Sequence, residues 1–200
     1  MLMSAIEYRE SLRGLKPVVY VDGRAVASVA DEPALLPGVN AVGLSYDFAL
    51  REDTSVLMRA AGGSGRSDYN RMLHVPRSCD ELLQKLEAVR LICRYTGCAQ
   101  RYLAGDAMAG ILQAAPALDA EHGTECAARA QAYYEHIRAA DLSVGIAMTD
   151  AKGDRSKRPH AQANPDAYVR IVERRADGIV ISGAKAIVTG GPYMHELLVM

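Results

Sequence analysis

The chain has 200 residues, of which 50% are hydrophobic, and a formal net charge of −1. This length suits one domain or two small ones, and the mixed charges exclude the electrostatic signature of a nucleic-acid or anionic-membrane partner. No apolar run approaches the roughly 18 residues that a membrane span needs, and the N-terminus is too polar for a signal peptide. We therefore expect a cytoplasmic protein whose four cysteines are reduced.

The N-terminal quarter contains a helix, a hairpin and a second helix. Ser4 and Glu7 have the spacing of a capping box, which predicts a short helix after them. Asp22-Gly23 lies between β-branched residues, which predicts a two-residue turn in a small hairpin over 18–27. Apolar residues then recur at helical spacing, which predicts a helix from Val39 to about Arg51.

A glycine-rich stretch at 60–70 matches no phosphate-binding motif and is interpreted as a loop. The next helix is predicted by a second capping box, at Ser78 and Glu81, and by a run of apolar residues up to Cys93.

The middle of the chain predicts two further helices. Residues 95–97 interrupt the preceding helix, and a new one is expected from Cys98 to about Gln113. Pro116 and Gly123 are expected to bound a loop, followed by a helix from Thr124 to Leu142.

After Leu142 the pattern changes to that of strands. A strand is predicted at Val144–Thr149, Asp177-Gly178 reads as a hairpin turn, and Ile179–Ile181 and Ala184–Val188 supply further strand. The predicted class is α+β: a helical N-terminal domain over 1–142, then the first strands of an antiparallel β domain over 143–200. The chain stops in an apolar run, so we expect it to be the N-terminal part of a longer protein.

The stretch AMTDAKGDR, 147–155, is the first candidate ligand site. Met148 can pack under a flat ligand, Thr149 can hydrogen-bond its rim, and Lys152, Gly153 and Arg155 suit an anion. A solvated charged turn is the alternative interpretation. Thr189-Gly190-Gly191 ends a later strand with permissive backbone, which suits the approach of a planar ligand.

A second candidate site lies in the segment CAQRY. Cys98 and Tyr102 are four residues apart and would share one face of the predicted helix, with Gln100 on a neighbouring face. The helix start would lower the pKa of the Cys98 thiol, although a plain structural role is the alternative. Cys93 and Cys98 lack the spacing of a zinc site, and no hydrolase triad or HExxH motif is present.

Taken together, these motifs resemble a family of flavoproteins. The chain is similar to the group that contains 4-hydroxyphenylacetate 3-hydroxylase and 4-hydroxybutyryl-CoA dehydratase (vinylacetyl-CoA isomerase). The likeness covers nearly the whole chain and is most specific at AMTDAKGDRS and DGIVISGAKAIVTG. These two motifs look closer to the dehydratase branch.

The resemblance implies an FAD-dependent enzyme with a plan like that of acyl-CoA dehydrogenases, in which a C-terminal helical bundle would follow this chain. It also implies a homotetramer and a small-molecule substrate, either an acyl-CoA or a phenol. The residues it assigns to the flavin are Met148, Thr149, Lys152, Gly153, Asp154, Arg155 and Thr189.

The two branches of the family imply different chemistry at the second site. In the dehydratase branch, Cys98 corresponds to a ligand of a four-iron four-sulfur cluster, and the next ligand position holds Tyr102 in this chain. In the hydroxylase branch, which takes reduced flavin from a partner reductase, Tyr102 matches a substrate-binding tyrosine, whereas Cys98 and Ile146 replace an arginine and a histidine. We therefore expect Cys98, Gln100 and Tyr102 to line the substrate side of a dehydratase or isomerase. A hydroxylase and a truncated chain without catalysis are the alternatives.

Overall fold

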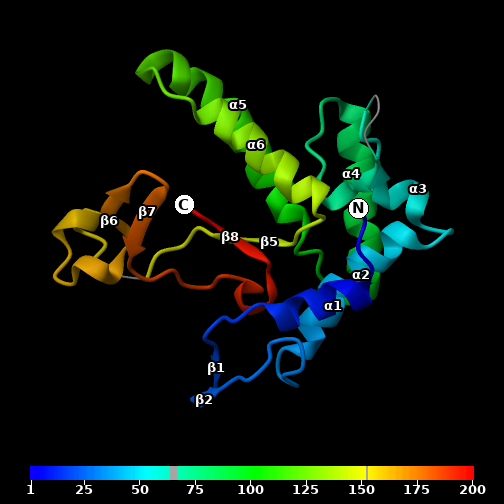
Figure 1. Ribbon diagram of the computed structural model, residues 1–200, viewed down its shortest axis with the longest axis horizontal. Coiled ribbons are helices and arrows are strands. Elements are labelled where there is room, and N and C mark those ends of the chain that lie inside the picture. The colour runs from blue at the N-terminus through cyan, green and yellow to red at the C-terminus, as the bar shows by residue number, and fades with distance from the viewer. Residues whose placement is uncertain (64–66, 152) are drawn as a thin grey trace.

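The computed structural model describes residues 1–63, 67–151 and 153–200, which form a mixed helical and β structure (Figure 1). The helices of these residues are α1 (Ala5–Gly14), α2 (Leu36–Leu50), α3 (Ser55–Met58), α4 (Cys79–Thr96), α5 (Tyr102–His122) and α6 (Cys126–Ala139). The strands are β1 (Tyr20–Val21), β2 (Arg24–Ala25), β3 (Arg59–Ala60), β4 (Tyr69–Asn70), β5 (Val144–Ala147), β6 (Arg170–Arg175), β7 (Gly178–Ser182) and β8 (Glu196–Val199). No helix among the described residues is long and apolar enough to cross a membrane.

Local sequence signals set the first elements. The Ser4 hydroxyl accepts the Glu7 N–H at 3.2 Å, and the Glu7 carboxylate accepts the Ser4 N–H at 2.7 Å, which confirms the first capping box. Val21 pairs with Arg24, so Asp22-Gly23 forms the predicted turn of the β1–β2 hairpin. Both turn residues have positive φ, 50° and 76°, as this type of turn requires.

The second capping box is half formed. The Ser78 hydroxyl accepts the Glu81 N–H at 3.2 Å. The Glu81 carboxylate, however, accepts the N–H of Arg77 at 2.6 Å and contacts the His74 ring at 3.1 Å. The predicted return bond from Glu81 to Ser78 is therefore wrong, because the chain before α4 offers the carboxylate a nearer donor.

Helix α5 differs from its prediction at both ends. It begins at Tyr102 rather than Cys98, because Gly97 ends α4 at a φ of 72° and the next four residues form a turn. It continues through Pro116 to His122, although Pro116 was expected to bound a loop. Pro116 is exposed, so water can reach the carbonyl that its missing N–H leaves free.

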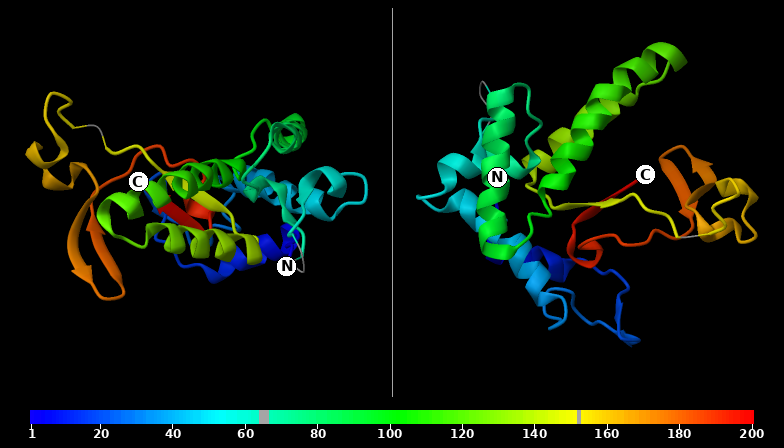
Figure 2. Two further views of the ribbon diagram at one scale, coloured as in Figure 1. Left: turned by 90° about the horizontal axis from the view of Figure 1, so that it is seen from above. Right: turned by 180° about the vertical axis from the view of Figure 1, so that it is seen from behind.

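The C-terminal quarter contains strands of both kinds. β5 pairs with β8 in parallel, with Val144 opposite Glu196, so the predicted antiparallel arrangement does not hold for this pair. β6 and β7 form the predicted antiparallel hairpin, which stands away from the helices (Figures 1 and 2). Arg175 pairs with Gly178, so the turn lies at Ala176-Asp177, one residue earlier than predicted.

The predicted strand at Ala184–Val188 is also replaced. In the described chain this segment forms no strand: its one ladder contact is the bridge between Lys185 and Asp150, and Ile187 has a positive φ of 57°. The Ala186 N–H also donates to the Thr149 carbonyl at 2.8 Å. The division into domains at 142 stays a prediction.

A buried ion pair connects the helical part to β5. Arg101 and Asp141 are each 1% exposed, and a guanidinium nitrogen of Arg101 lies 2.7 Å from the Asp141 carboxylate. The Arg101 guanidinium also stacks at 3.7 Å over the ring of Tyr46 in α2. Burial opposes this charge, but Tyr46 and Asp141 outweigh it and raise the pKa of Arg101. The Asp141 carboxylate also accepts the N–H of Met3 at 3.0 Å.

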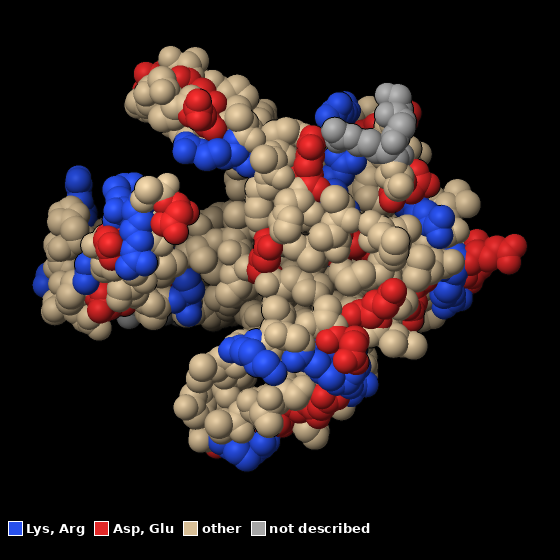
Figure 3. Space-filling model, viewed as in Figure 1, with Lys and Arg blue, Asp and Glu red and all other residues tan. Residues whose placement is uncertain are grey.

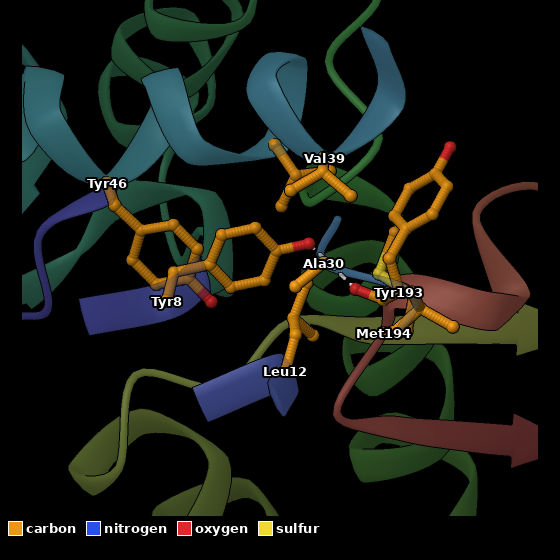
Figure 4. Close-up of a cluster of buried hydrophobic side chains, with 9 residues drawn as sticks. Tyr8, Leu12, Ala30, Val39, Tyr46, Tyr193 and Met194 are labelled. Atoms are coloured by element: carbon orange, nitrogen blue, oxygen red, sulfur yellow. Dashed lines mark hydrogen bonds between the residues drawn. The ribbon is translucent and has the colours of Figure 1, made fainter. Parts of the chain in front are cut away.

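The same contact extends into the core beneath α1. The Tyr46 ring stacks on Tyr8 of α1 with centroids 4.8 Å apart. The Tyr8 hydroxyl donates to the Tyr193 carbonyl at 2.7 Å, which joins α1 to the segment before β8 (Figure 4). Arg101 therefore contacts α2 directly and reaches α1 and the C-terminal segment through aromatic packing.

Replacing Asp141 by asparagine tests this ion pair. Asparagine tolerates the positive φ of 50° at this position but leaves the Arg101 charge buried without its anion. We expect Asp141→Asn to lower the free energy of unfolding by about 3–5 kcal/mol, measured by urea denaturation. Asp177→Asn, in the exposed turn between β6 and β7, should change it by less than about 0.5 kcal/mol. Equal effects would contradict the importance of the pair.

His195 precedes β8 and is held as a neutral ring. The Ser143 N–H donates to His195 Nδ1 at 2.9 Å, so Nδ1 must be unprotonated. Nε2 lies 2.7 Å from the Ser11 hydroxyl, which itself donates to the Tyr8 carbonyl at 2.6 Å and so accepts from the ring. Burial, followed by the Arg101 charge, lowers the pKa of His195 to about 4, although Glu196 acts in the opposite direction.

This arrangement makes stability depend on pH. In the unfolded chain His195 binds a proton near pH 6.5, whereas in the folded chain it does so near pH 4. The unfolded state therefore holds more protons between these values, and stability is lost as the pH falls from 6.5 to 4. We expect this histidine to account for up to about 3 kcal/mol of that loss. Urea titrations of His195→Gln should show a flatter profile than those of His160→Gln, whose ring is exposed.

Candidate functional site

A groove of about 420 Å³ lies between α5 and the end of the β5–β8 pair. Two of the predicted flavin residues, Met148 and Thr149, line it. Met148 is 62% exposed and is the residue directly after Ala147, the buried last residue of β5. The residues that complete the lining are Leu103, Asp106, Ala107, Ile146, Ile187 and Met200. The surface can therefore accept a flat apolar ligand.

Lys185 fixes the floor of this groove. Its ammonium donates to the Met148 carbonyl at 3.0 Å and to the Met200 carbonyl, and it lies 2.8 Å from the Asp150 carboxylate. The Lys185 side chain is 9% exposed, and its hydrogen bonds to Asp150 lower the pKa of that carboxyl. One lysine thus holds the ends of β5 and β8 together under the groove.

The residues predicted to bind phosphate lie further along the chain, in a closed loop. Gln162 fastens this loop, because its amide accepts the Asp154 N–H at 2.8 Å and donates to the Asp154 carbonyl at 2.8 Å. A Cβ at Gly153 would lie 2.3 Å from the Gln162 oxygen, so a larger residue there would have to displace the side chain that fastens the loop. Arg155 is exposed on this loop, and Lys152 lies outside the described residues.

Asp154 has a structural partner of its own. Its carboxylate accepts from the backbone N–H and the hydroxyl of Ser156, at 3.0 and 2.6 Å, and these bonds lower the pKa of the Asp154 carboxyl. Gly153, Asp154 and Arg155 are not among the residues that line the groove. The structure therefore places Met148 and Thr149 at the groove, and Gly153 and Arg155 on the loop beyond it.

Gln100 comes close to Gly190, the residue after Thr189, outside the groove lining. A Cβ at Gly190 would lie 2.7 Å from the Gln100 side-chain oxygen, which is buried and has no hydrogen-bond partner among the described residues. Gly190 also has a φ of 75°, which favours glycine. This segment thus carries a free buried acceptor one residue from Thr189.

Cys98 and Tyr102 do not share a helix face. Cys98 lies in the turn before α5 and is exposed, whereas Tyr102 is the first residue of α5 and packs against a core cluster with Phe48 and Ile92. The predicted position of Cys98 at a helix start is therefore wrong. Within the described residues no group of three or more His, Cys, Asp or Glu side chains is placed to hold a metal ion. Of the two positions where the resemblance expects cluster ligands in this chain, the first holds the Cys98 thiol and the second holds the Tyr102 phenol.

The sequence analysis missed a charged pair beside the groove. Lys85 of α4 is 2% exposed, and its ammonium lies 2.7 Å from the carboxylate of Asp106, one of the lining residues. A signal was present in the sequence, because Lys85 falls on the same helix face as Ala88 and Ile92, which are buried. A lysine among core positions is rare unless it is paired.

A second network, which includes His74, lies away from this groove. The Tyr69 hydroxyl is 2.6 Å from His74 Nδ1, and His74 Nε2 is 3.1 Å from Glu81. Burial lowers the pKa of His74, so this ring is neutral and connects β4 to the start of α4. It lines a cavity of about 220 Å³ that contains none of the predicted site residues.

The glycine at 190 gives a test of the site's packing. Any side chain there must adopt a positive φ and meet both the Gln100 oxygen and the end of Met194. We expect Gly190→Ala to lower the free energy of unfolding by about 2–4 kcal/mol. Gly110→Ala, where the helix is open to solvent, should instead raise it by about 0.5–1 kcal/mol. Denaturation curves that show no loss for Gly190→Ala would contradict the close approach of Gln100.

Comparison with known proteins places this fold. A family model described as "4-hydroxyphenylacetate 3-hydroxylase N terminal" matches residues 5–200, and the chain belongs to this family. It is 37% identical over its whole length to 4-hydroxybutyryl-CoA dehydratase/vinylacetyl-CoA-Delta-isomerase of Clostridium aminobutyricum, of which it covers 41%. It is 30% identical over 96% of its length to the oxygenase component of 4-hydroxyphenylacetate 3-monooxygenase of Geobacillus sp. (strain PA-9), of which it covers 39%.

Solved structures agree with this assignment. An oxygen-tolerant archaeal 4-hydroxybutyryl-CoA dehydratase from N. maritimus superposes with a TM-score of 0.93 at 37% identity, over all of this chain and 40% of that one. The oxygenase component of 4-hydroxyphenylacetate 3-monooxygenase, complexed with FAD and 4-hydroxyphenylacetate, superposes at 0.79 and 22% identity over 99% of this chain and 40% of that one, which shows the shared fold. The predicted family is confirmed, and these relatives are enzymes. The chain spans about two fifths of their length.

Proposed function

We propose that the chain forms one wall of the FAD site of an enzyme on the acyl-CoA dehydratase and isomerase side of the family. The observation that carries the proposal is the groove in which Met148 and Thr149 meet the α5 surface. Its apolar lining and its size suit a flat ring, since ligand sites are mostly apolar with a few placed polar groups. The higher identity to the dehydratase, 37% against 30%, supports this branch.

The residues present fit a flavin in the following roles. Met148 would pack against the ring, and Thr149 would hydrogen-bond its rim. Lys152 and Arg155 would neutralise phosphate on the cofactor or on CoA, with Gly153 and Asp154 shaping the loop that carries them. When bound, FAD would supply reversible electron transfer while a proton leaves the carbon next to the thioester.

Gln100 and Thr189 would contact the ligand from outside the described groove lining. The buried Gln100 oxygen has no hydrogen-bond partner among the described residues, so a ligand N–H or O–H would satisfy it if the side chain turned toward that ligand. Thr189 would hydrogen-bond near the reactive edge of the flavin ring. Cys98, exposed before α5, would lie toward the substrate.

The described residues do not fit an iron–sulfur cluster. Such clusters are held by several thiolates, and here Tyr102 stands where the second thiolate would be. We therefore assign Cys98 a position on the substrate side rather than a role as a cluster ligand.

Tyr102 favours a second candidate, a reduced-flavin-dependent aromatic monooxygenase with a partner reductase. In that case Tyr102 would contact a phenol, although Ile146 lines the groove where that branch has a histidine. A homotetramer is proposed for either enzyme. A chain that folds but catalyses nothing is the candidate of another class.

The names of the two relatives share one further feature, a hydroxyl on the substrate. 4-Hydroxybutyryl-CoA carries an aliphatic hydroxyl and 4-hydroxyphenylacetate a phenolic one. We propose that the substrate of this protein also carries a hydroxyl.

Flavin binding tests the proposal directly. We expect the purified protein to bind FAD, measured by quenching of flavin fluorescence, with an absorbance spectrum that lacks an iron–sulfur shoulder. Arg155→Gln should weaken binding by about ten-fold, because a hydrogen bond to a charged group is worth about 1.5–3 kcal/mol. Arg158→Gln, an exposed neighbour on the same loop, is the matched control and should have little effect. A folded protein that binds no flavin would sink the proposal.

A further inference from the structure

The groove lining contains one charged side chain. Six of the eight residues that the structure describes there are apolar, and Thr149 contributes a hydroxyl. Asp106 is the remaining one, and it lies 54% exposed on the α5 side. Across from it, the apolar side chains of Ile146 and Met148 offer no hydrogen bond. A ligand in this groove therefore meets a carboxylate in otherwise apolar surroundings.

Lys85 holds that carboxylate in place. Its ammonium, buried on α4, approaches Asp106 from beneath α5 at 2.7 Å. Gly105 makes room for it, since a Cβ there would lie 2.8 Å from the Lys85 ammonium and 2.8 Å from the Met72 carbonyl. The pair thus depends on a lysine, a glycine and an aspartate that the helix packing brings to one place.

Burying the Lys85 ammonium costs folding free energy that a purely structural role would not require. Removing an ammonium from water costs several kcal/mol, and apolar residues of similar size often replace buried ion pairs without loss of stability. Only one partner is buried here, because the Lys85 side chain is 2% exposed and the Asp106 carboxylate opens into the groove. The lysine therefore fixes the direction of a carboxylate that still has acceptor positions free toward a ligand.

On the face shown in Figure 3, basic and acidic side chains are interspersed rather than gathered into one patch. Beside the groove, Lys185 is already paired with Asp150, and neither is among its lining residues. Asp106 is therefore the charged side chain that a ligand in the groove meets.

We propose that Asp106 is a specificity-determining residue that accepts the hydrogen bond of the substrate hydroxyl, and that Lys85 is its positioning residue. This inference rests on the proposed function, which supplies a substrate with a hydroxyl. A substrate without a donor at this point desolvates the carboxylate and leaves the acceptor positions that Lys85 does not use without a partner, so the groove discriminates against it. Tyr102 lies one helical turn before Asp106 on the same face of α5 and borders this position.

The test compares a hydroxylated ligand with its deoxy analogue. The FAD-loaded protein is titrated by calorimetry with 4-hydroxyphenylacetate against phenylacetate, and with 4-hydroxybutyryl-CoA against butyryl-CoA. We expect the wild type to prefer the hydroxylated member of at least one pair by about ten-fold or more, the value of one hydrogen bond to a charged acceptor. Asp106→Leu should abolish this ratio, and Lys85→Met should reduce it.

Matched variants separate the proposal from simpler effects. Asp80→Leu, exposed in the first turn of α4, should keep both the ratio and the FAD affinity. If Asp106→Leu fails to fold because Lys85 is left unpaired, the double variant Lys85→Met/Asp106→Leu removes both charges and gives the same reading. Failure of the wild type to bind FAD contradicts the proposed function instead.

Three results overturn the role of Asp106 in a protein that does bind FAD. The first is an unchanged ratio in the Asp106 variants, and the second is no preference in the wild type for either hydroxylated ligand. The third is a loss of FAD affinity in Asp106→Leu with the ratio intact, which would place Asp106 against the flavin rather than the substrate.

Discussion

The buried charge of Arg101 is the constraint on which the arrangement of this chain depends. A guanidinium that is 1% exposed needs an anion, and Asp141 supplies it from a turn 40 residues later. Asp141 also accepts a hydrogen bond from Met3, and Tyr46 covers the guanidinium face. The segment before α1, helix α2 and the turn before β5 therefore meet around the Arg101 guanidinium. β5 begins three residues after Asp141, the anion that pairs with Arg101.

Placement of β5 decides where the groove forms. Its buried residues pack among α5 and α6, and β8 adds to it in parallel. Ala147 of β5 pairs with Val199 of β8, and the carbonyls of the residues that follow, Met148 and Met200, both bind Lys185. Lys185 lies in the GAKA motif that marks the family, so a residue of that motif holds the floor of the groove rather than contacting a ligand.

Local signals were enough to predict the first capping box and the first hairpin turn but not the pairings between distant segments. Ser4 and Asp22-Gly23 act on neighbours in sequence, so their spacing determines their geometry. The parallel β5–β8 pair joins residues 52 apart, and nothing in either strand's composition distinguishes it from an antiparallel pair. Pro116 was misread because its cost depends on exposure, which the sequence does not display.

The same limit applied to the candidate site. Met148 and Thr149 were found because a family motif carries them, whereas Asp106 and Lys85 belong to no motif and meet only when α4 packs against α5. Leu82, Leu83 and Leu86, which marked α4 as a helix, are 46%, 59% and 44% exposed, so its core face is the one that carries Lys85. Because the leucines were expected to mark the buried face of α4, Lys85 was not expected to be buried.

The composition of the groove favours a ligand over a covering protein surface. An apolar face that served only for packing has no need of a carboxylate in its lining, because covering Asp106 would remove the water from the acceptor positions that Lys85 does not use. A site for a purely polar ligand would not expose Met148 and Ile187 at 62% and 82%. A flat apolar body with one hydrogen-bond donor satisfies both, since it covers the apolar lining and pairs with Asp106. A flavin and a hydroxylated substrate held together would present that combination.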